Sequence, residues 1–175
     1  MTRASRFWLP AVLVLATACG APAATEQAAP APPAAPEADN PHAHHGPVND
    51  PDSPVSLWAV QTGPLGIVAT DGGGRLIYRS DADSAAPPTS TCTGDCTTTW
   101  TPLLVGPGQQ LDLEGVSRDK IGRLVRPDGT TQLTLAGWPL YVRPDDDGNL
   151  ASTGANGADG RWWAVTPTGD KATPA

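Results

Sequence analysis

The sequence predicts an all-β fold, a small antiparallel sandwich or barrel built from two sequence repeats and preceded by a disordered tether. Three observations support this prediction. Short β-rich runs alternate with turn residues after position 56, a segment beginning at Gly74 is echoed at Gly137, and residues 21–56 lack large apolar side chains. The predicted divisions are a signal peptide at 1–18, a linker at 19–56, a β domain at 57–169 with repeats at about 63–105 and 118–166, and a disordered tail at 170–175.

The chain begins with the features of an export signal. Arg3 and Arg6 precede an apolar stretch at 7–15, and small residues at 16–18 form a cleavage site. The apolar stretch is shorter than the roughly 20 residues that a membrane-spanning helix needs. We therefore expect an extracytoplasmic protein whose first 18 residues are removed.

Cys19 follows the cleavage site directly. The run Leu15-Ala16-Thr17-Ala18-Cys19-Gly20 resembles the lipobox of bacterial lipoproteins, although Ala16 stands where leucine is commonest. The resemblance implies a diacylglycerated Cys19 that anchors the protein to the bacterial cell membrane, with palmitate as a typical acyl chain. An ordinary secretory signal next to a free thiol is the alternative, but it leaves an odd cysteine in an exported chain.

The linker and the net charge restrict the choice of partners. Residues 21–56 contain nine prolines and ten alanines, a composition typical of an extended, semi-rigid spacer. Removal of the two arginines in the signal changes the formal charge from −7 to −9, so the sequence excludes nucleic acid as a partner. The expected contacts are the membrane, through the lipid, and an unidentified envelope component or protein.

All three histidines lie in the linker, at His42, His44 and His45. Imidazoles suit Zn or Cu, so an envelope metal-binding protein is one alternative function. A flexible segment, however, offers no surrounding groups that fix the imidazole orientation. We therefore interpret the tract as a solvated polar patch and expect no cofactor other than a weakly bound divalent metal.

The predicted strands follow in order along the domain. Runs at 57–61, 66–70 and 75–80 are β-rich, with a glycine turn at 71–74. Residues 123–137 predict a hairpin, because Pro127-Asp128-Gly129 presets one dihedral angle and supplies a positive φ. Pro139 is expected to open a strand or lie on an edge, and the run at 162–166 closes the domain.

The two repeats share a Gly, a Tyr and an Asp-rich turn, followed by a Trp. Tyr78 and Trp100 belong to the first repeat, and Tyr141 and Trp162 belong to the second. Two such units packed with approximate two-fold symmetry would form the sandwich or barrel.

The run from Leu65 to Trp163 resembles the secreted-repeat bacterial lipoproteins, a family of uncharacterised function. The segment from Arg126 to Tyr141 fits the family pattern R-x-D-G-x-x-Q-x-T-x-x-G-x-P-L-Y, and Cys92, Cys96 and Trp100 fit its cysteine-containing segment. The family motif Y-x-aromatic-x-x-D is half kept, because Ser80 and Arg143 occupy its aromatic positions. The resemblance therefore implies a family but no activity.

Cys92 and Cys96 are predicted to form a structural disulfide. Residues four apart on a helix hold their Cβ atoms too far apart for this bond, so 93–95 must form a turn in which Gly94 is well placed. A thiol redox protein is the second alternative function. It needs a lowered thiol pKa, and the neighbouring residues include Asp95 but no cation.

Residues 145–147 are a run of aspartates followed by Gly148. An EF-hand is excluded, because Arg143 and Gly154 would occupy its first and twelfth positions. A weak calcium site at Asp145 or Asp147 stays open, beside the commoner use of aspartates in turns.

The aromatic residues suggest a binding surface. Neighbouring strand residues point to opposite faces, so Trp162 and Trp163 cannot both be buried, and Trp162 is expected to be the exposed ring. Beside Arg161, with Tyr78 and Tyr141, it would stack on a sugar or on an aromatic side chain of a partner; covering a sheet edge is the alternative. No histidine lies in the domain, and no nucleophile or phosphate-binding loop stands out, so we predict a binding or structural module rather than an enzyme.

Overall fold

The computed structural model describes residues 48–174. The predicted signal peptide, the Cys19 anchor and the histidine tract lie outside the described residues. Within them, short strands in four sheets account for nearly all regular structure, so the all-β prediction is confirmed. No helix among the described residues has the length and apolar character needed to cross a bilayer.

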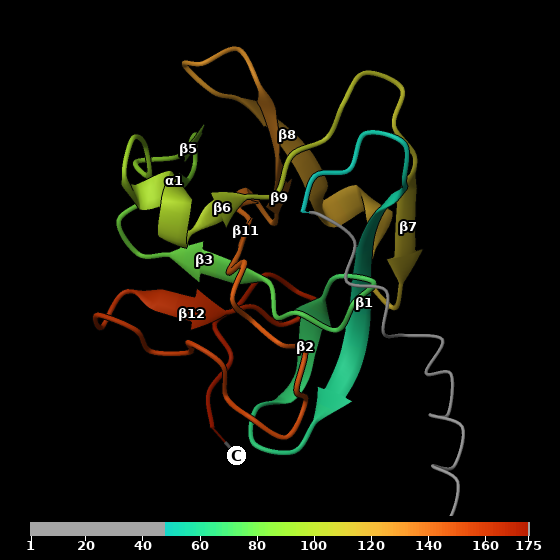
Figure 1. Cartoon of the computed structure of the whole chain (residues 1–175), viewed down its shortest axis with the longest axis vertical. Coiled ribbons are helices and arrows are strands. Elements are labelled where there is room, and N and C mark those ends of the chain that lie inside the picture. The colour runs from blue at the N-terminus through green and yellow to red at the C-terminus, as the bar shows by residue number, and fades with distance from the viewer. Residues whose placement is uncertain (1–47, 175) are drawn as a thin grey trace, which may run out of the picture. The chain divides into compact units, whose positions relative to one another are not determined.

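The first sheet is centred on β1 (Val55–Thr62), whose alternation buries Val55 and Leu57. It pairs antiparallel with β2 (Gly66–Thr70) and parallel with β7 (Leu111–Glu114), as Figure 1 shows. The β1–β2 hairpin follows the predicted runs. The parallel pair was not predicted and departs from the expected antiparallel arrangement.

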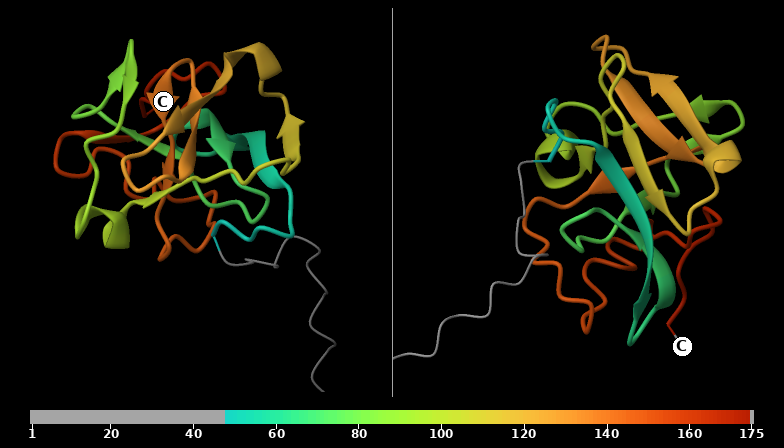
Figure 2. Two further views of the ribbon diagram at one scale, coloured as in Figure 1. Left: turned by 90° about the horizontal axis from the view of Figure 1, so that it is seen from above. Right: turned by 90° about the vertical axis from the view of Figure 1, so that its right-hand side faces the viewer.

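The second sheet contains the predicted hairpin. β8 (Ile121–Val125) pairs antiparallel with β9 (Thr131–Leu135), and β10 (Trp138–Pro139) lies at the edge beside β9. Gly129 has φ +84° in the turn, and Pro139 lies on the edge strand, so both predictions are confirmed. The turns of the β1–β2 and β8–β9 hairpins point to opposite ends of the β domain in the right-hand view of Figure 2.

The third sheet joins the two repeats. Its strand order is β12 (Trp162–Ala164), β3 (Tyr78–Ser80), β11 (Tyr141–Val142) and β6 (Thr101–Pro102), all antiparallel. Each repeat contributes one inner and one outer strand, and each outer strand pairs with the inner strand of the other repeat. Neither repeat can therefore form this sheet alone.

The remaining elements lie in the loops. β4 (Ser84–Ala85) and β5 (Pro88–Thr89) form a two-stranded hairpin, α1 (Cys96–Thr99) is a single helical turn, and a 3₁₀ turn spans Arg118–Lys120.

Two hydrophobic clusters lie on opposite faces of the third sheet, because successive residues of a strand alternate. Ile77, Leu140 and Val142 belong to the larger cluster, which also contains residues of both hairpins. Tyr78 and Tyr141 belong to the smaller cluster, together with Trp100 and Trp162. The smaller cluster is thus the aromatic one.

Both predicted boundaries of the β domain were wrong by a few residues. Residues 48–56, assigned to the linker, pack on the domain: Asn49 Oδ1 accepts a hydrogen bond from the Leu104 amide at 2.7 Å, and β1 begins at Val55. Ala172, assigned to a disordered tail, is buried, and its amide donates to the Ala164 carbonyl at 2.7 Å. Long-range contacts that composition does not encode extend the domain at each end.

Candidate functional site

The tyrosines of the two repeats face each other and bond to aspartates crosswise. Tyr78 and Tyr141 are partners across β3 and β11. The Tyr141 hydroxyl donates to Asp83 Oδ2 at 2.7 Å, and the Tyr78 hydroxyl donates to Asp146 Oδ2 at 3.2 Å. Each tyrosine therefore uses the aspartate of the other repeat, which links the two halves of the domain.

These polar groups are satisfied inside the fold. Asp83 also accepts hydrogen bonds from the amide and the hydroxyl of Thr91, at 2.8 and 2.9 Å. Burial raises the pKa of both Tyr78 and Tyr141 well above the ordinary value, and the nearby aspartates act in the same direction. Both phenols are therefore neutral donors across the physiological pH range.

A pair of stacked tryptophans extends this core. Trp100 and Trp162 lie parallel, with ring centroids 4.0 Å apart and an interplanar angle of 7°. Tyr78 contacts Trp100 edge-on, and Tyr141 contacts Trp162 edge-on, both at 5.1 Å. Aromatic contacts of this kind stabilise a core beyond the area they bury.

The predicted binding surface is wrong for Tyr78 and Tyr141, and Trp162 is not the exposed ring that was expected, although it lines a cleft together with Arg161. Tyr78 and Tyr141 are completely buried, and Trp162 is only 5% exposed. The strand alternation assigned the wrong indole, because Trp162 packs between the aromatic rings of both repeats while Trp163 is the half-buried one. Arg161 is exposed, as its predicted role requires.

Trp163 belongs to a polar network at the outer face of β12. Its indole nitrogen donates to Asp81 Oδ2 at 2.9 Å, and Lys171 Nζ donates to the same oxygen at 2.6 Å. Partial burial acts to raise the pKa of Asp81, but these two bonds together with the charges of Lys171 and Arg79 lower the pKa below its ordinary value. Burial lowers the pKa of Arg79. The guanidinium carbon of Arg79 lies 3.3 Å from the centroid of the Trp138 ring.

The predicted disulfide between Cys92 and Cys96 is confirmed, with Cα atoms 5.3 Å apart. Gly94 has φ +58° in the turn before α1, as the spacing required. The sequence neighbourhood contains no cation, but the fold places one close by: Arg126 donates to the Cys92 carbonyl at 2.8 Å.

Two clefts flank the aromatic core, one beside the loop of each repeat. We call them the first-repeat cleft, of about 390 Å³, and the second-repeat cleft, of about 290 Å³. The first is lined by Ser80, Ala82, Thr91, Cys92, Cys96, Thr99, Trp100, Asp159, Arg161 and Trp162. The second is lined by Tyr78, Arg143, Asp145, Asp146, Asp147, Ser152, Gly154 and Ala155.

The clefts occupy equivalent places in the two repeats. Tyr78 and Tyr141 are 63 positions apart in the chain, and the same shift relates four lining residues of one cleft to four of the other. The equivalent pairs are Ser80 and Arg143, Ala82 and Asp145, Thr91 and Gly154, and Cys92 and Ala155. The differences between the clefts therefore lie in side chains rather than in topology.

The predicted calcium ligands are used within the second-repeat cleft. Asp145 forms an ion pair with Arg143 at 2.5 Å, and Asp147 accepts a hydrogen bond from the Asn149 amide at 3.0 Å. Within residues 48–174, no group of three or more His, Cys, Asp or Glu side chains lies close enough together to hold a metal ion. The aspartates thus serve the turn and the ion pair in this structure.

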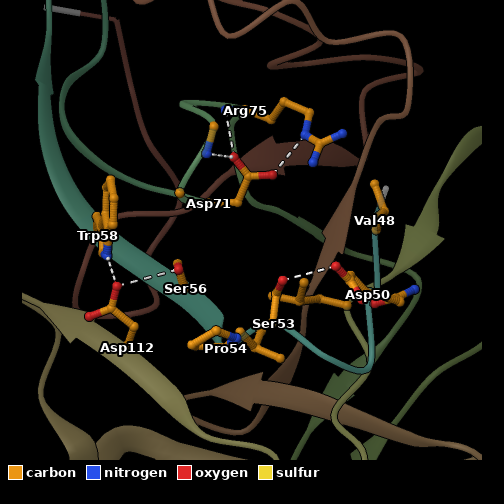
Figure 3. Close-up of a pocket in the computed structure, with 14 residues that line it drawn as sticks. Val48, Asp50, Ser53, Pro54, Ser56, Trp58, Asp71, Arg75 and Asp112 are labelled. Atoms are coloured by element: carbon orange, nitrogen blue, oxygen red, sulfur yellow. Dashed lines mark hydrogen bonds and ion pairs between the residues drawn. The ribbon is translucent and has the colours of Figure 1, made fainter. Parts of the chain in front are cut away.

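A third pocket, of about 320 Å³, lies between β1, β7 and the turn at 71–75 (Figure 3). Trp58 donates to Asp112 Oδ2 at 3.0 Å, Asp71 Oδ2 accepts from Arg75 at 2.7 Å, and Asp50 accepts from a neighbouring serine. Each of the three carboxylates is thus bonded to a side chain of the pocket wall. We interpret the pocket as the junction at which residues 48–54 meet the first sheet.

Sequence reasoning missed the crosswise bonds of Asp83 and Asp146 and the buried Arg126. Each Tyr is followed by an Asp five residues later in the same repeat. This spacing does not tell whether the Tyr bonds to that Asp or to the Asp of the other repeat. Arg126 is 4% exposed and donates to Ser90 and Gln132 as well as to Cys92. Its position before a turn gave no signal of burial.

The chain matches a known protein family. The sequence model of a family described as a secreted repeat of unknown function matches residues 59–104 and 122–166. These two segments coincide with the two repeats that the fold interlocks. No curated protein and no solved structure matches the chain.

Proposed function

Because the chain belongs to the family of secreted repeats of unknown function and is therefore extracytoplasmic, we propose that it is a non-catalytic module of the cell envelope. It works by binding or by structural presence, tethered to the outer side of the membrane through a lipid on Cys19. A cysteine that carries two or more acyl chains, palmitate among them, is attached stably to the membrane, whereas a single chain gives only marginal binding. The Pro- and Ala-rich linker spaces the folded domain from the membrane.

The observation that supports a non-catalytic module is the crosswise hydrogen bonding between the motif tyrosines and aspartates. A general acid or base needs a carboxylate or phenol within reach of a substrate. Here both motif tyrosines are completely buried, and their hydroxyl groups are bonded to the motif aspartates. The repeat motif therefore builds a rigid support and leaves recognition to the surface around it.

Membrane attachment is tested by detergent phase partition of the full chain expressed in a bacterium. We expect the wild type in the detergent phase with an acylated N-terminal cysteine by mass spectrometry, and Cys19→Ser in the aqueous phase. An unmodified Cys19 thiol in the wild type would overturn the anchor. Folding of both proteins is compared by tryptophan fluorescence, so that loss of the anchor is separated from loss of the domain.

A thiol redox role is the second candidate, favoured by one observation. Arg161 lines the same cleft as Cys92 and Cys96, and nearby cations lower a thiol pKa. Thiol labelling after mild reduction separates the two functions. A structural disulfide predicts that reduction destabilises or unfolds the domain without giving a thiol of lowered pKa, whereas a redox protein predicts a folded dithiol with a reactive, low-pKa thiol that can be reoxidised.

A further inference from the structure

We propose that the first-repeat cleft binds the ring of an uncharged saccharide. The inference rests on the proposed function, because it assumes that the module works by binding. It assigns the ligand class from three properties of the cleft: the residue that opens it, the charges at its rim, and the aromatic floor.

Ser80 opens the cleft. In the second repeat the equivalent residue is Arg143, whose guanidinium carbon lies 5.3 Å over the Trp100 ring and whose side chain pairs with Asp145. In the first repeat, Ser80 is the direct partner of Trp162 across β3 and β12, and Ala82 replaces the aspartate. The small side chains leave open the space that an ion pair fills in the other half of the domain.

The rim of the cleft carries one charge of each sign. Asp159 and Arg161 are both exposed, and neither forms an ion pair or a side-chain hydrogen bond with another described residue. Asp159 would repel an anionic ligand, and Arg161 would repel a cationic ligand. A ligand with hydroxyl groups satisfies both, because hydroxyls donate to a carboxylate and accept from a guanidinium.

The floor of the cleft is aromatic and keeps unused donors. Trp100 and Trp162 line it, and each is 5% exposed. Their indole N–H groups bond to no acceptor among residues 48–174, and neither nitrogen is among the fully buried atoms without a partner. A saccharide ring combines an apolar face with polar edges, which matches a floor of this kind, and 390 Å³ lies in the usual range for small-molecule sites.

The binding test is a titration of the folded wild-type domain, within the full chain, followed by ¹H–¹⁵N NMR of the indole N–H groups. The probes are cellobiose and N,N′-diacetylchitobiose as neutral disaccharides, with a glucosamine disaccharide and a glucuronate disaccharide as the cationic and anionic counterparts. We expect saturable shifts at Trp100 and Trp162 with the neutral probes, while the indole signals of Trp58, Trp138 and Trp163 stay in place.

Two variants locate the site; because Ser80 is 1% exposed and its Oγ accepts a hydrogen bond from the Ala82 amide, folding of the first variant is checked by tryptophan fluorescence. Ser80→Arg with Ala82→Asp places in the first-repeat cleft the ion pair that the fold already holds at the equivalent place, and we expect it to abolish the shifts. Arg161→Ala should weaken binding about tenfold or more, in line with the loss of a hydrogen bond from a charged group. Arg123→Ala, an exposed arginine on β8, is the matched control and should bind as the wild type does.

Three results would overturn the inference. They are the absence of any shift up to about 10 mM neutral disaccharide, a preference for either charged probe, and shifts produced instead by a phenylalanine-containing peptide. Each of these leaves the membrane partition of the wild type unchanged, so failure of the ligand class is distinguishable from failure of the proposed function.

Discussion

Tyr141→Phe removes one hydroxyl group from the point where the two repeats are linked. In the wild type this hydroxyl donates to Asp83 at 2.7 Å and bonds to Ser90 Oγ at 2.7 Å, in a side chain with no exposed surface. The substitution leaves the ring and its contact with Trp162 in place. It therefore isolates the polar link from the aromatic packing.

The expected loss follows from the groups that remain. A hydrogen bond to a charged group contributes about 1.5–3 kcal/mol, and a buried acceptor that loses its donor adds to the cost. Because Asp83 is 8% exposed and keeps only its bonds from Thr91, we expect Tyr141→Phe to lower the free energy of unfolding by about 2–3 kcal/mol. Tyr78→Phe breaks a 3.2 Å bond to the half-buried Asp146 and a 3.0 Å bond from the Ala155 amide, and it should cost less, about 1–2 kcal/mol, since the bond to the carboxylate is longer and more exposed.

The assay is urea unfolding followed by tryptophan fluorescence, with a double-mutant cycle of Tyr141→Phe and Asp83→Asn. The cycle should give a coupling energy above about 1 kcal/mol, as expected for directly bonded residues. A loss below about 0.5 kcal/mol for Tyr141→Phe, in the range of ordinary surface substitutions, would refute the role of the crosswise bonds.

The same two phenols predict a dependence on alkaline pH. Their pKa values are raised in the folded state, so the neutral forms stabilise the fold below the ordinary tyrosine pKa near 10, and this contribution is lost as the pH rises above it. Tyr78 and Tyr141 are the only tyrosines of the chain, so phenolate absorbance reports on them directly. We expect no phenolate signal near pH 10 until the domain unfolds. Normal titration of either residue in the folded protein would contradict its burial.

Further perturbations test the disulfide, a glycine and the C-terminal boundary. Replacing both cysteines of the disulfide by alanine should lower the free energy of unfolding by about 2 kcal/mol, the loop-entropy value for so short a ring, and an unchanged urea midpoint would show that the bond contributes nothing. Gly137→Ala should destabilise the domain clearly more than Gly129→Ala: both glycines have φ near +85°, but a Cβ at 137 would collide with a backbone carbonyl oxygen whereas a Cβ at 129 meets nothing within 4 Å. Equal midpoints for the two variants would contradict that packing. Deleting 170–175 should lower the free energy of unfolding by about 1–3 kcal/mol, because it removes the hydrogen bond and the burial of Ala172. Deleting 173–175 should have no measurable effect. Equal stability of the two truncated chains would show that Ala172 does not pack on the domain.

The hairpins could be predicted because their signals are local. The turn at 126–130 contains Pro and Gly at the positions that the backbone dihedrals require, and alternation of apolar residues sets the flanking strands. The disulfide was predictable for a similar reason, since only a turn brings side chains four positions apart within bonding distance. The family resemblance depended on the same short segments.

The site could be predicted only in part: Arg161 and Trp162 were named from the sequence, but the other residues of the cleft are distant in the chain. Ser80 and Trp162 become neighbours only when β12 pairs with β3, and Arg161 reaches the cysteines by the same pairing. Alternation along one strand placed Trp162 outside, since that rule cannot tell which face the other repeat will cover.

The sequence alone therefore determined the class of fold, the two repeats, the disulfide and the features of export, all of which depend on residues close together in the chain. Tertiary structure decided which repeat bonds to which aspartate, which tryptophan is buried and where a cleft stays open. The physical reason is that antiparallel pairing between the repeats brings residues 50 to 90 positions apart into contact, and local propensity carries no information about partners at that distance.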